Sequence, residues 1–470
     1  MTAGGERPEV PILSFVGGAG TVTGSRFLIE TPRSTVLVDC GLFQGLKELR
    51  LRNRQPFPID PSDIDAVVVT HAHVDHIGYL PRLCTQGFRG PVFCTDGTAD
   101  LARIVLPDSG HLQEEEARYA NRVGYSKHRP AVGLYTEADA RAALEQLEPT
   151  RFGHPTQITD DIKVTLRPAG HILGSATATI DLVDFGRRVL FSGDLGRSHH
   201  PILTPPAAPD GADVIVMEST YGGRYHDDEG AIDQLADAIT RTAKRGGTVV
   251  IPAFAVDRTE VVLFRLSELM HAGAIPAMPV YVDSPMALRA LGVYRRAIDN
   301  GALDVRPELA GQPDPFDTGQ LHEIRDVEDS KALATAPHPS IIVSASGMAT
   351  GGRVLHHLAR LLPDRRNTVA LVGFQAAGTR GRLLTQGRPE VKLLGGYVRV
   401  RAEISNLRSF SVHADHRELM DWLAAATRAP DVVYLAHGEP EGANALHDAI
   451  EAEFDWPAVV PRHLERVRLL

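Results

Sequence analysis

The chain is 470 residues long, too long for a single hydrophobic core, so two or three domains are expected. Hydrophobic residues make up an ordinary 43%, no apolar run approaches the ~20 residues of a membrane-spanning helix, and the first residues lack a secretory signal pattern, which together predict a globular protein outside the membrane. The formal net charge of −10 argues against indiscriminate binding to nucleic acid, which depends on neutralising phosphates.

Short predicted strands dominate residues 1–212. Each is rich in β-branched or large apolar residues and is bounded by Gly, Pro or Asp. This pattern favours two packed sheets with helices outside them over a single parallel sheet. A polar helical stretch at 101–143 interrupts the series and predicts an excursion from the first domain. The predicted strands are 11–16, 25–30, 35–38, 65–70, 91–94, 162–167, 176–182 and 188–192.

Regular alternation of strands and helices begins at residue 213 and predicts a second domain over 213–390. Its strands are continuously apolar, which suits a mainly parallel sheet covered on both faces. The stretch 306–337, rich in proline and charge, predicts an exposed loop region. A third segment, 391–470, carries a further helix–strand–helix pattern. The predicted strands are 213–218, 247–254, 279–283, 340–344, 368–374 and 431–436, and the predicted helices are 231–244, 260–271, 417–425 and 442–454.

The strongest chemical signal is the run His71-Ala72-His73-Val74-Asp75-His76, directly after the apolar residues 66–70. Three imidazoles and a carboxylate at a strand end suit a divalent metal such as zinc. Core packing gives no reason for three histidines in this place. The motif therefore predicts a metal site.

One loop cannot enclose two metal ions, so further ligands are expected at other strand ends. Three candidates stand there: His171, which lies among glycines that allow a tight turn, Asp194 and His437. Each of them taken alone is more often a structural residue than a ligand. Together with the first motif, in this order along the chain, they predict a binuclear site.

These motifs resemble those of the metallo-β-lactamase superfamily. The resemblance implies a four-layer αββα sandwich formed by residues 1–212 and 391–470, with two Zn²⁺ ions per chain and Mn²⁺ as the less favoured metal. It implies that Asp39 orients ligands by hydrogen bonds. The implied ligands are His71, His73 and His171 for one ion, Asp75, His76 and His437 for the other, and Asp194 between them.

Motifs in the remaining sequence resemble the β-CASP branch of that superfamily, whose members cut nucleic acids. They include Glu218 after a predicted strand, the run 251–258, the turn 344–353 and His413. The branch carries an inserted α/β domain, here 213–390. A histidine at the position of His437 is typical of the RNA-cutting members. The likeness is to bacterial and archaeal RNA-cutting relatives of the pre-mRNA 3′-end cleavage endonuclease, and it departs from the usual pattern at Asp257, Arg380 and Val412.

The resemblance and the chemistry together predict a zinc-dependent ribonuclease that uses a metal-bridging hydroxide, as an endonuclease with or without exonuclease activity. Asp75 has a second expected role, accepting a hydrogen bond that steers the hydroxide. RNA cleavage leaves an alkoxide that needs a proton, and His413 is the candidate donor. Glu218 is expected to fix its tautomer.

Candidate phosphate contacts lie in a stretch of concentrated positive charge. Basic residues gather between 353 and 408, where few carboxylates oppose them. Glycine-rich turns present backbone amides to phosphates. The candidates are Ser346, Gly347, Arg353 and Ser411.

Two other functions stay open at this point. The first is a metallohydrolase of a small ester, thioester or phosphoester, which explains the ligands but does not account for Glu218 or His413. The second is a scaffold protein, which does not account for a complete ligand set. The expected partner is single-stranded RNA, with a homodimer as an open alternative. Three cysteines, Cys40, Cys84 and Cys94, without Cys-x-x-Cys spacing predict a reducing, cytoplasmic location.

Overall fold

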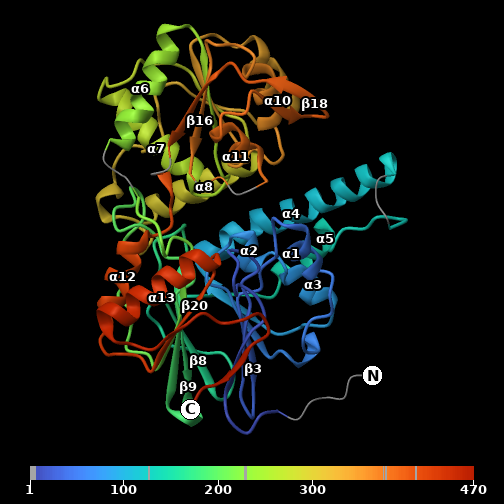
Figure 1. Ribbon diagram of the computed structural model, residues 1–470, viewed down its shortest axis with the longest axis vertical. Helices are drawn as coiled ribbons and strands as arrows, with labels where there is room; N and C mark the ends of the chain where they lie inside the picture. Colours follow the sequence, from blue (N-terminus) through green and yellow to red (C-terminus); the bar gives the residue numbers. More distant parts are fainter. Residues whose placement is uncertain (1–6, 125–127, 227–229, 374, 376–377, 408–409) are drawn as a thin grey trace. The chain divides into compact units, whose positions relative to one another are not determined.

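The computed structural model describes residues 7–124, 128–226, 230–373, 375, 378–407 and 410–470 (Figure 1). The chain forms two compact units: unit 1 comprises Met1–Tyr225 with His413–Leu470, and unit 2 comprises His226–Val412. None of the helices in the described ranges has both the length and the apolar composition that a bilayer crossing requires.

Unit 1 contains two seven-stranded sheets. In the first, β3, β4, β5 and β6 run parallel, whereas β1 pairs antiparallel with both β2 and β22, and β2 pairs antiparallel with β3. Its strand order is β22 (Arg466–Arg468), β1 (Ile12–Phe15), β2 (Phe27–Glu30), β3 (Thr35–Val38), β4 (Ala66–Val68), β5 (Val92–Thr95) and β6 (Leu147–Thr150).

The second sheet joins the two ends of unit 1's sequence. Its order is β21 (Ala458–Val459), β20 (Val432–Ala436), β11 (Val214–Glu218), β10 (Arg187–Phe191), β9 (Ala176–Leu182), β8 (Ile162–Pro168) and β7 (Thr156–Gln157). β11 pairs in parallel with β10 and with β20, so Glu218 lies opposite Ala436. β11 therefore belongs to unit 1. The boundary between the two units lies after Tyr225, rather than between residues 212 and 213 as expected from the sequence.

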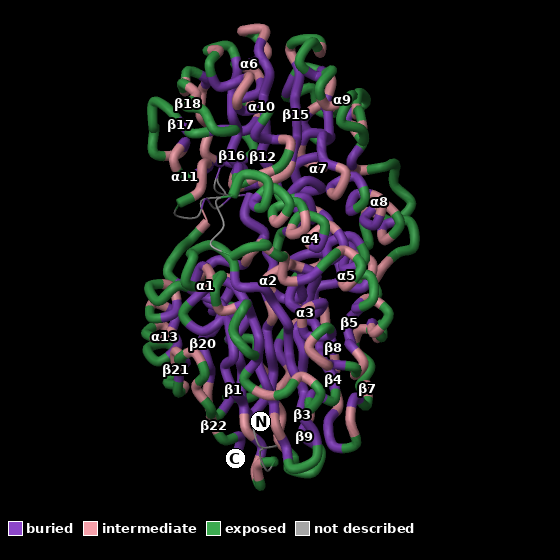
Figure 2. The backbone as a smooth tube through the Cα atoms, turned by 90° about the vertical axis from the view of Figure 1, so that its right-hand side faces the viewer, coloured by how far each residue is buried: buried purple, intermediate pink, exposed green. Residues whose placement is uncertain are grey.

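Helices cover the outer face of each sheet of unit 1. One apolar core fills the space between the sheets, and separate cores lie under the helices on either side. Figure 2 shows most of the strands as buried. The predicted four-layer αββα arrangement is confirmed. The covering helices are α2 (Val74–Ile77), α3 (Leu80–Thr85), α4 (Asp96–Val123) and α5 (Glu137–Leu144) on the first sheet, and α12 (His416–Ala424) and α13 (Pro440–Phe454) on the second.

The expected polar excursion at 101–143 is the long helix α4 followed by α5 (Figure 1). Thr95 begins α4 because its side chain accepts a hydrogen bond from the Thr98 amide. Gly124 ends it in the left-handed conformation, with φ of 74°. Shorter elements of the chain are α1 (Lys47–Arg52) and the 3₁₀ turns Pro61–Asp63, Val183–Phe185, Pro307–Leu309 and Leu333–Thr335.

Unit 2 is built on a six-stranded sheet in which every pairing is parallel. Its order is β14 (Leu321–Glu323), β13 (Val280–Val282), β15 (Ser340–Ser344), β12 (Thr248–Pro252), β16 (Thr368–Val372) and β19 (Glu403–Leu407). Figure 1 shows α6 and α10 on opposite sides of β16. The helices are α6 (Ala231–Lys244), α7 (Arg258–His271), α8 (Pro285–Asp299), α9 (Val327–Ala332), α10 (Val354–Leu361) and α11 (Arg380–Thr385), and β17 (Glu390–Leu393) pairs with β18 (Gly396–Arg399).

Two sequence expectations for unit 2 need correction. The stretch 306–337 is not only loop, because β14 pairs with β13 and α9 follows it. The sequence placed the end of the inserted domain at 390, but β19 pairs with β16 and extends the unit to Val412. The strands β14 and β19 are short and contain polar residues, so the sequence pattern does not identify them as strands. They are strands because each pairs with a neighbouring strand of the sheet.

His463, near the C-terminus, predicts a pH-dependent component of stability. Burial, assisted by Arg52 and Arg26, lowers the pKa of His463 to about 4. The unfolded side chain takes up a proton near pH ~6.5, so the folded state loses stability as pH falls from there towards the folded value. We expect the free energy of unfolding to decrease less over this window in His463→Gln than in the wild type. Urea denaturation at a series of pH values measures both; parallel curves would contradict the expectation.

Candidate metal centre

The loop after β4 is held rigidly against the neighbouring segment 40–42. The Cys40 amide donates to the His76 carbonyl at 2.7 Å, and the Leu42 amide donates to the Val74 carbonyl at 2.9 Å. A Cβ at Gly41 would lie 1.6 Å from the carbonyl oxygen of Asp75, so only glycine fits between them. The backbone of the histidine-rich motif is therefore held by hydrogen bonds and close packing against residues 40–42.

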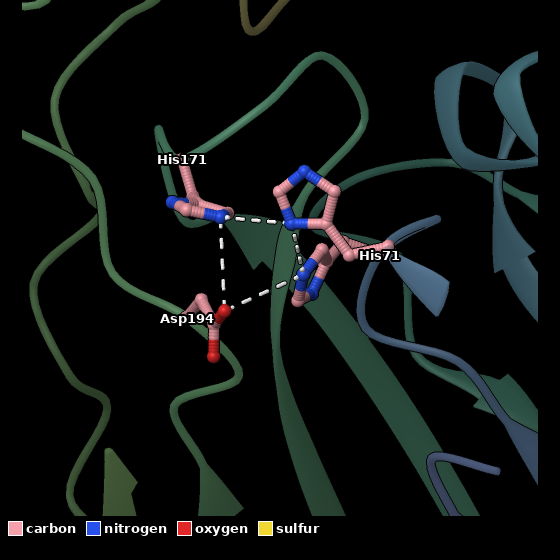
Figure 3. Close-up of side chains that lie close together, drawn as sticks. His71, His171 and Asp194 are labelled. Carbon is pink, nitrogen blue, oxygen red and sulfur yellow. Dashed lines mark hydrogen bonds and ion pairs between the residues drawn. The ribbon is translucent and has the colours of Figure 1, made fainter. Parts of the chain in front are cut away.

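Four side chains from three loops form a first cluster, which we call cluster A: His71, His73, His171 and Asp194. The Nε2 atoms of His71 and His171 each lie 3.2 Å from Nδ1 of His73. The same two atoms lie 3.5 and 3.6 Å from Oδ2 of Asp194 (Figure 3).

A second cluster, cluster B, lies on the other side of the Asp194 carboxylate. It contains Asp75, His76 and His437. Oδ1 of Asp194 lies 3.2 Å from His76 Nε2 and 3.3 Å from His437 Nδ1. His437 Nε2 lies 3.2 Å from His76 Nε2 and 3.5 Å from Oδ2 of Asp75. The two oxygens of Asp194 therefore face one cluster each.

These distances fit metal coordination better than hydrogen bonding. Zinc bonds of about 2.0–2.1 Å in a tetrahedral site place ligand atoms roughly 3.3–3.4 Å apart. Oδ1 of Asp194 is buried and has no hydrogen-bond partner among the described residues, although two imidazole nitrogens are near. Imidazole and carboxylate donors suit zinc and similar divalent metals. The clusters therefore have the composition and spacing that could hold metal ions.

Electrostatics prepares the cluster residues for a cation. Burial lowers the pKa of His71 and of His73, so both imidazoles are neutral and keep a lone pair for a metal. Burial acts on His76 in the same sense, but the carboxylates of Asp194 and Asp39 raise its pKa well above the usual value. Burial would raise the pKa of Asp194, yet the imidazoles around it hold that pKa well below the ordinary range. A proton or a metal ion is favoured there.

Residues behind the clusters orient the rings. Asp39, buried with φ of 58°, accepts a hydrogen bond from His76 Nδ1 at 2.7 Å and another from the Thr70 amide at 2.8 Å. This leaves His76 Nε2 directed at cluster B. The hydroxyls of Thr70 and Thr220 lie 3.2 Å from Nδ1 of His71 and His437, respectively. Neither threonine could be identified from the sequence, because a threonine near a strand end is common and does not indicate a metal site.

His413 and Glu218 lie together next to cluster A. His413 Nδ1 is 3.4 Å from Oε1 of Glu218 and 3.9 Å from Oδ2 of Asp194. Oε1 of Glu218 also accepts a hydrogen bond from the Leu195 amide at 2.6 Å, which fixes the carboxylate. Burial lowers the pKa of His413, but Glu218 and Asp194 more than compensate and raise it. The His413 side chain remains 21% exposed, enough to meet a substrate.

The candidate phosphate residues lie in unit 2, whereas both clusters and His413 lie in unit 1. Arg353 donates to Asp283 Oδ1 at 2.7 Å and to the Arg325 carbonyl at 2.9 Å, so its guanidinium stabilises unit 2. Ser346 bonds to Thr350, Gly347 packs on Phe254, and Ser411 is buried. Within the basic stretch, Arg366 and Arg399 pair with Asp364 and Glu390, and Arg408 falls outside the described residues.

Three family descriptions match consecutive parts of the chain. Residues 19–88 match the metallo-beta-lactamase superfamily, and residues 259–384 match the Beta-Casp domain. Residues 397–461 match the Zn-dependent metallo-hydrolase RNA specificity domain. The matched regions include the histidine-rich loop of cluster A, His413 and His437.

Similar proteins cover almost the whole chain. Ribonuclease TTHA0252 of Thermus thermophilus is 37% identical over 92% of this chain and 94% of its own length. Proteins named transcription termination factor FttA are 30% identical in Methanocaldococcus jannaschii and 31% identical in Methanothermobacter thermautotrophicus, over 97% of this chain and 71% of theirs. A crystal structure described as a protein of unknown function from Enterococcus faecalis V583 has a TM-score of 0.55 at 14% identity, covering 98% of this chain and 100% of that one, which supports the fold alone.

Proposed function

Because this chain belongs to the β-CASP family of metallo-β-lactamase-fold hydrolases, we propose that it is a metal-dependent ribonuclease that hydrolyses RNA phosphodiester bonds. The observation that carries the proposal is the pair of ligand clusters sharing Asp194, with His413 and Glu218 beside them. The RNA specificity domain match and the 37% identity to a ribonuclease support RNA as the substrate. The enzyme acts as an endonuclease, with or without exonuclease activity.

The clusters are assigned to two Zn²⁺ ions, one held by cluster A and one by cluster B, with Asp194 contributing an oxygen to each. The donor set favours zinc over manganese. When bound, the ions polarise the phosphoryl group and lower the pKa of water so that it attacks at neutral pH. Short distances between opposed imidazole nitrogens support this assignment.

The protein's own residues position the substrate and move protons. Asp75 ligates in cluster B and accepts a hydrogen bond from the attacking water. Glu218 accepts a hydrogen bond from Nδ1–H of His413, which keeps that proton, and Nε2–H of the imidazolium delivers its proton to the leaving oxygen of the phosphodiester. The raised pKa of His413 favours the protonated ring this step requires. Asp39 holds His76 in place and touches no reacting atom.

Single-stranded RNA, a homodimer and a cytoplasmic location remain predictions. All three cysteines, Cys40, Cys84 and Cys94, are buried and free, which agrees with a reducing compartment. Hydrolysis of a small ester is the second reading, but the buried pairing of His413 with Glu218 favours a reaction with a poor leaving group.

One assay separates these readings. The zinc-loaded protein is incubated with single-stranded RNA, single-stranded DNA and a chromogenic ester, with chelator-treated protein as the control. We expect cleavage of RNA, little of DNA, and loss of cleavage after chelation that zinc restores. Ester turnover with intact RNA would support the second reading, and no turnover with two ions bound would favour a scaffold.

Asp39→Asn is expected to weaken metal binding without abolishing it. The amide keeps the shape of the carboxylate but accepts less strongly from His76 Nδ1, and loss of such a supporting contact lowers metal affinity by about 10–100-fold. Competition with a chromophoric chelator measures the affinity. Thr31→Val, which removes a buried hydroxyl that donates to Asp161, serves as the control and should leave affinity unchanged. Equal affinities for Asp39→Asn and wild type would reject the orienting role.

A further inference from the structure

Two aromatic pairs lie side by side where residues 221–225 pass along the start of α12. The His416 amide donates to the Arg224 carbonyl at 2.9 Å, which joins the two segments. The rings of Tyr221 and His413 lie 6.0 Å apart between centroids. One turn further, the rings of Tyr225 and His416 lie 5.1 Å apart.

The two tyrosines differ sharply in exposure. Tyr221 is 8% exposed and supports His413 from within unit 1. Tyr225 is 63% exposed, among the most exposed large side chains of the described residues. The guanidinium carbon of Arg417 lies 6.0 Å from the centre of the Tyr225 ring. An exposed tyrosine beside an imidazole and a guanidinium presents an aromatic ring and a positive charge to solvent.

The His416 ring and the backbone of Arg417, next to Tyr225, are held in place by hydrogen bonds. Nδ1 of His416 donates to the Gly222 carbonyl, and its backbone amide bonds to Arg224. Arg417 follows in the first turn of α12, which Asp415 and Glu418 cap reciprocally. A surface with this rigidity loses little conformational entropy when a planar ligand stacks on it.

The two glutamates described near this surface are paired with arginines. Glu439 faces Arg224 at 3.9 Å, and Glu418 is bound to Arg197 at 2.7 Å and to the Ser198 hydroxyl. Among the described residues Arg417 has no ion-pair partner. Glu439 and Glu418 are therefore paired, whereas, within the described ranges, the guanidinium of Arg417 beside Tyr225 is not.

We propose that Tyr225, His416 and Arg417 form a subsite that stacks one nucleobase of the RNA beside the bond that is cut. The proposal rests on the proposed ribonuclease function and names how that site holds its substrate. Only two residues separate His413 from His416 in the chain, so their Cα atoms lie within ~11 Å of each other. Aromatic and arginine faces are the surfaces on which single-stranded RNA bases stack, with little sequence preference.

The test compares Tyr225→Ala and Tyr225→Trp with the wild type on one short RNA. Loss of a base–aromatic stack raises KM by about 5- to 100-fold, and kcat is expected to stay within about two-fold because no reacting atom is touched. Tyr225→Trp should keep the wild-type KM. Tyr119→Ala is the matched control, since Tyr119 is 51% exposed under Arg122 on α4, with 5.3 Å from guanidinium carbon to ring centre.

A second arm replaces single bases of the RNA by abasic sites, one position at a time. At the stacked position the abasic RNA should raise the KM of the wild type but not that of Tyr225→Ala, because the contact is already absent. Additive effects at every position, or an unchanged KM in Tyr225→Ala, would overturn the subsite while leaving the ribonuclease function standing. Failure of the wild type to cut RNA would overturn both. Zinc content and thermal unfolding of each variant establish that the fold is intact.

Discussion

Replacement of Asp194 by asparagine is expected to remove metal from both clusters and to abolish measurable RNA cleavage. Asp194 belongs to cluster A through Oδ2, and its other oxygen, Oδ1, faces the imidazoles of cluster B. Asparagine offers one oxygen and no negative charge. Its amide nitrogen, a donor, would face imidazole nitrogens on one side. The loss should therefore exceed the ~100-fold effect on metal affinity that removal of a supporting contact produces.

Elemental analysis of the dialysed protein measures this outcome, and RNA cleavage with added zinc measures it independently. Asp161→Asn is the matched control because Asp161 is equally buried in unit 1 and receives hydrogen bonds from Ser34 and Thr31. It should lower stability but keep the wild-type metal content. If Asp194→Asn retained two ions per chain, the proposal that Asp194 is a ligand of both ions would be wrong.

The proximity of the candidate ligands could be predicted from the sequence because these residues stand at strand ends. Apolar strands are recognisable, and polar side chains directly after them gather at one edge of a sheet. The motif 71–76 and the separate His171, Asp194 and His437 follow this rule, and the structure places them within two adjoining clusters. The family drawn from these motifs is confirmed by the comparisons.

The domain boundaries could not be predicted in the same way. β11 has the apolar pattern of the parallel strands that follow it in the chain, yet it pairs with β10 and with the distant β20. β19 carries polar residues and still completes the sheet of unit 2 beside β16. Local pattern sets the type of an element, but long-range pairing decides which sheet receives it.

The role of Arg353 could not be predicted from the sequence either. Arg353 stands in a glycine-rich turn typical of phosphate contacts, but it donates to Asp283, which also receives hydrogen bonds from Ser330 and His357. Side chains from α9, α10 and the end of β13 meet there, and no spacing in the sequence reveals it. Buried ionic groups must be partnered, so such networks are fixed only by the tertiary structure.

Replacement of His413 by alanine is expected to lower kcat for RNA by about 10²–10⁴-fold, the usual contribution of a general acid, while two metal ions stay bound. His413 contacts Glu218 and lies 3.9 Å from Asp194, but it belongs to neither cluster. Glu218→Gln should lower kcat by less. The double variant should be no slower than His413→Ala, because the carboxylate acts through the imidazole.

A substrate that needs no acid distinguishes proton donation from a structural role of His413. Sulfur in place of the leaving oxygen departs as a thiolate without protonation, since a thiol is far more acidic than an alcohol. RNA substrates with a single 3′- or 5′-bridging sulfur are therefore offered separately to wild type and to His413→Ala. We expect the two enzymes to differ by less than about ten-fold on one of these substrates, against about 10²–10⁴-fold on ordinary RNA. The sulfur position that restores cleavage identifies the leaving atom, whereas an undiminished defect on both substrates would assign His413 to positioning rather than to acid catalysis.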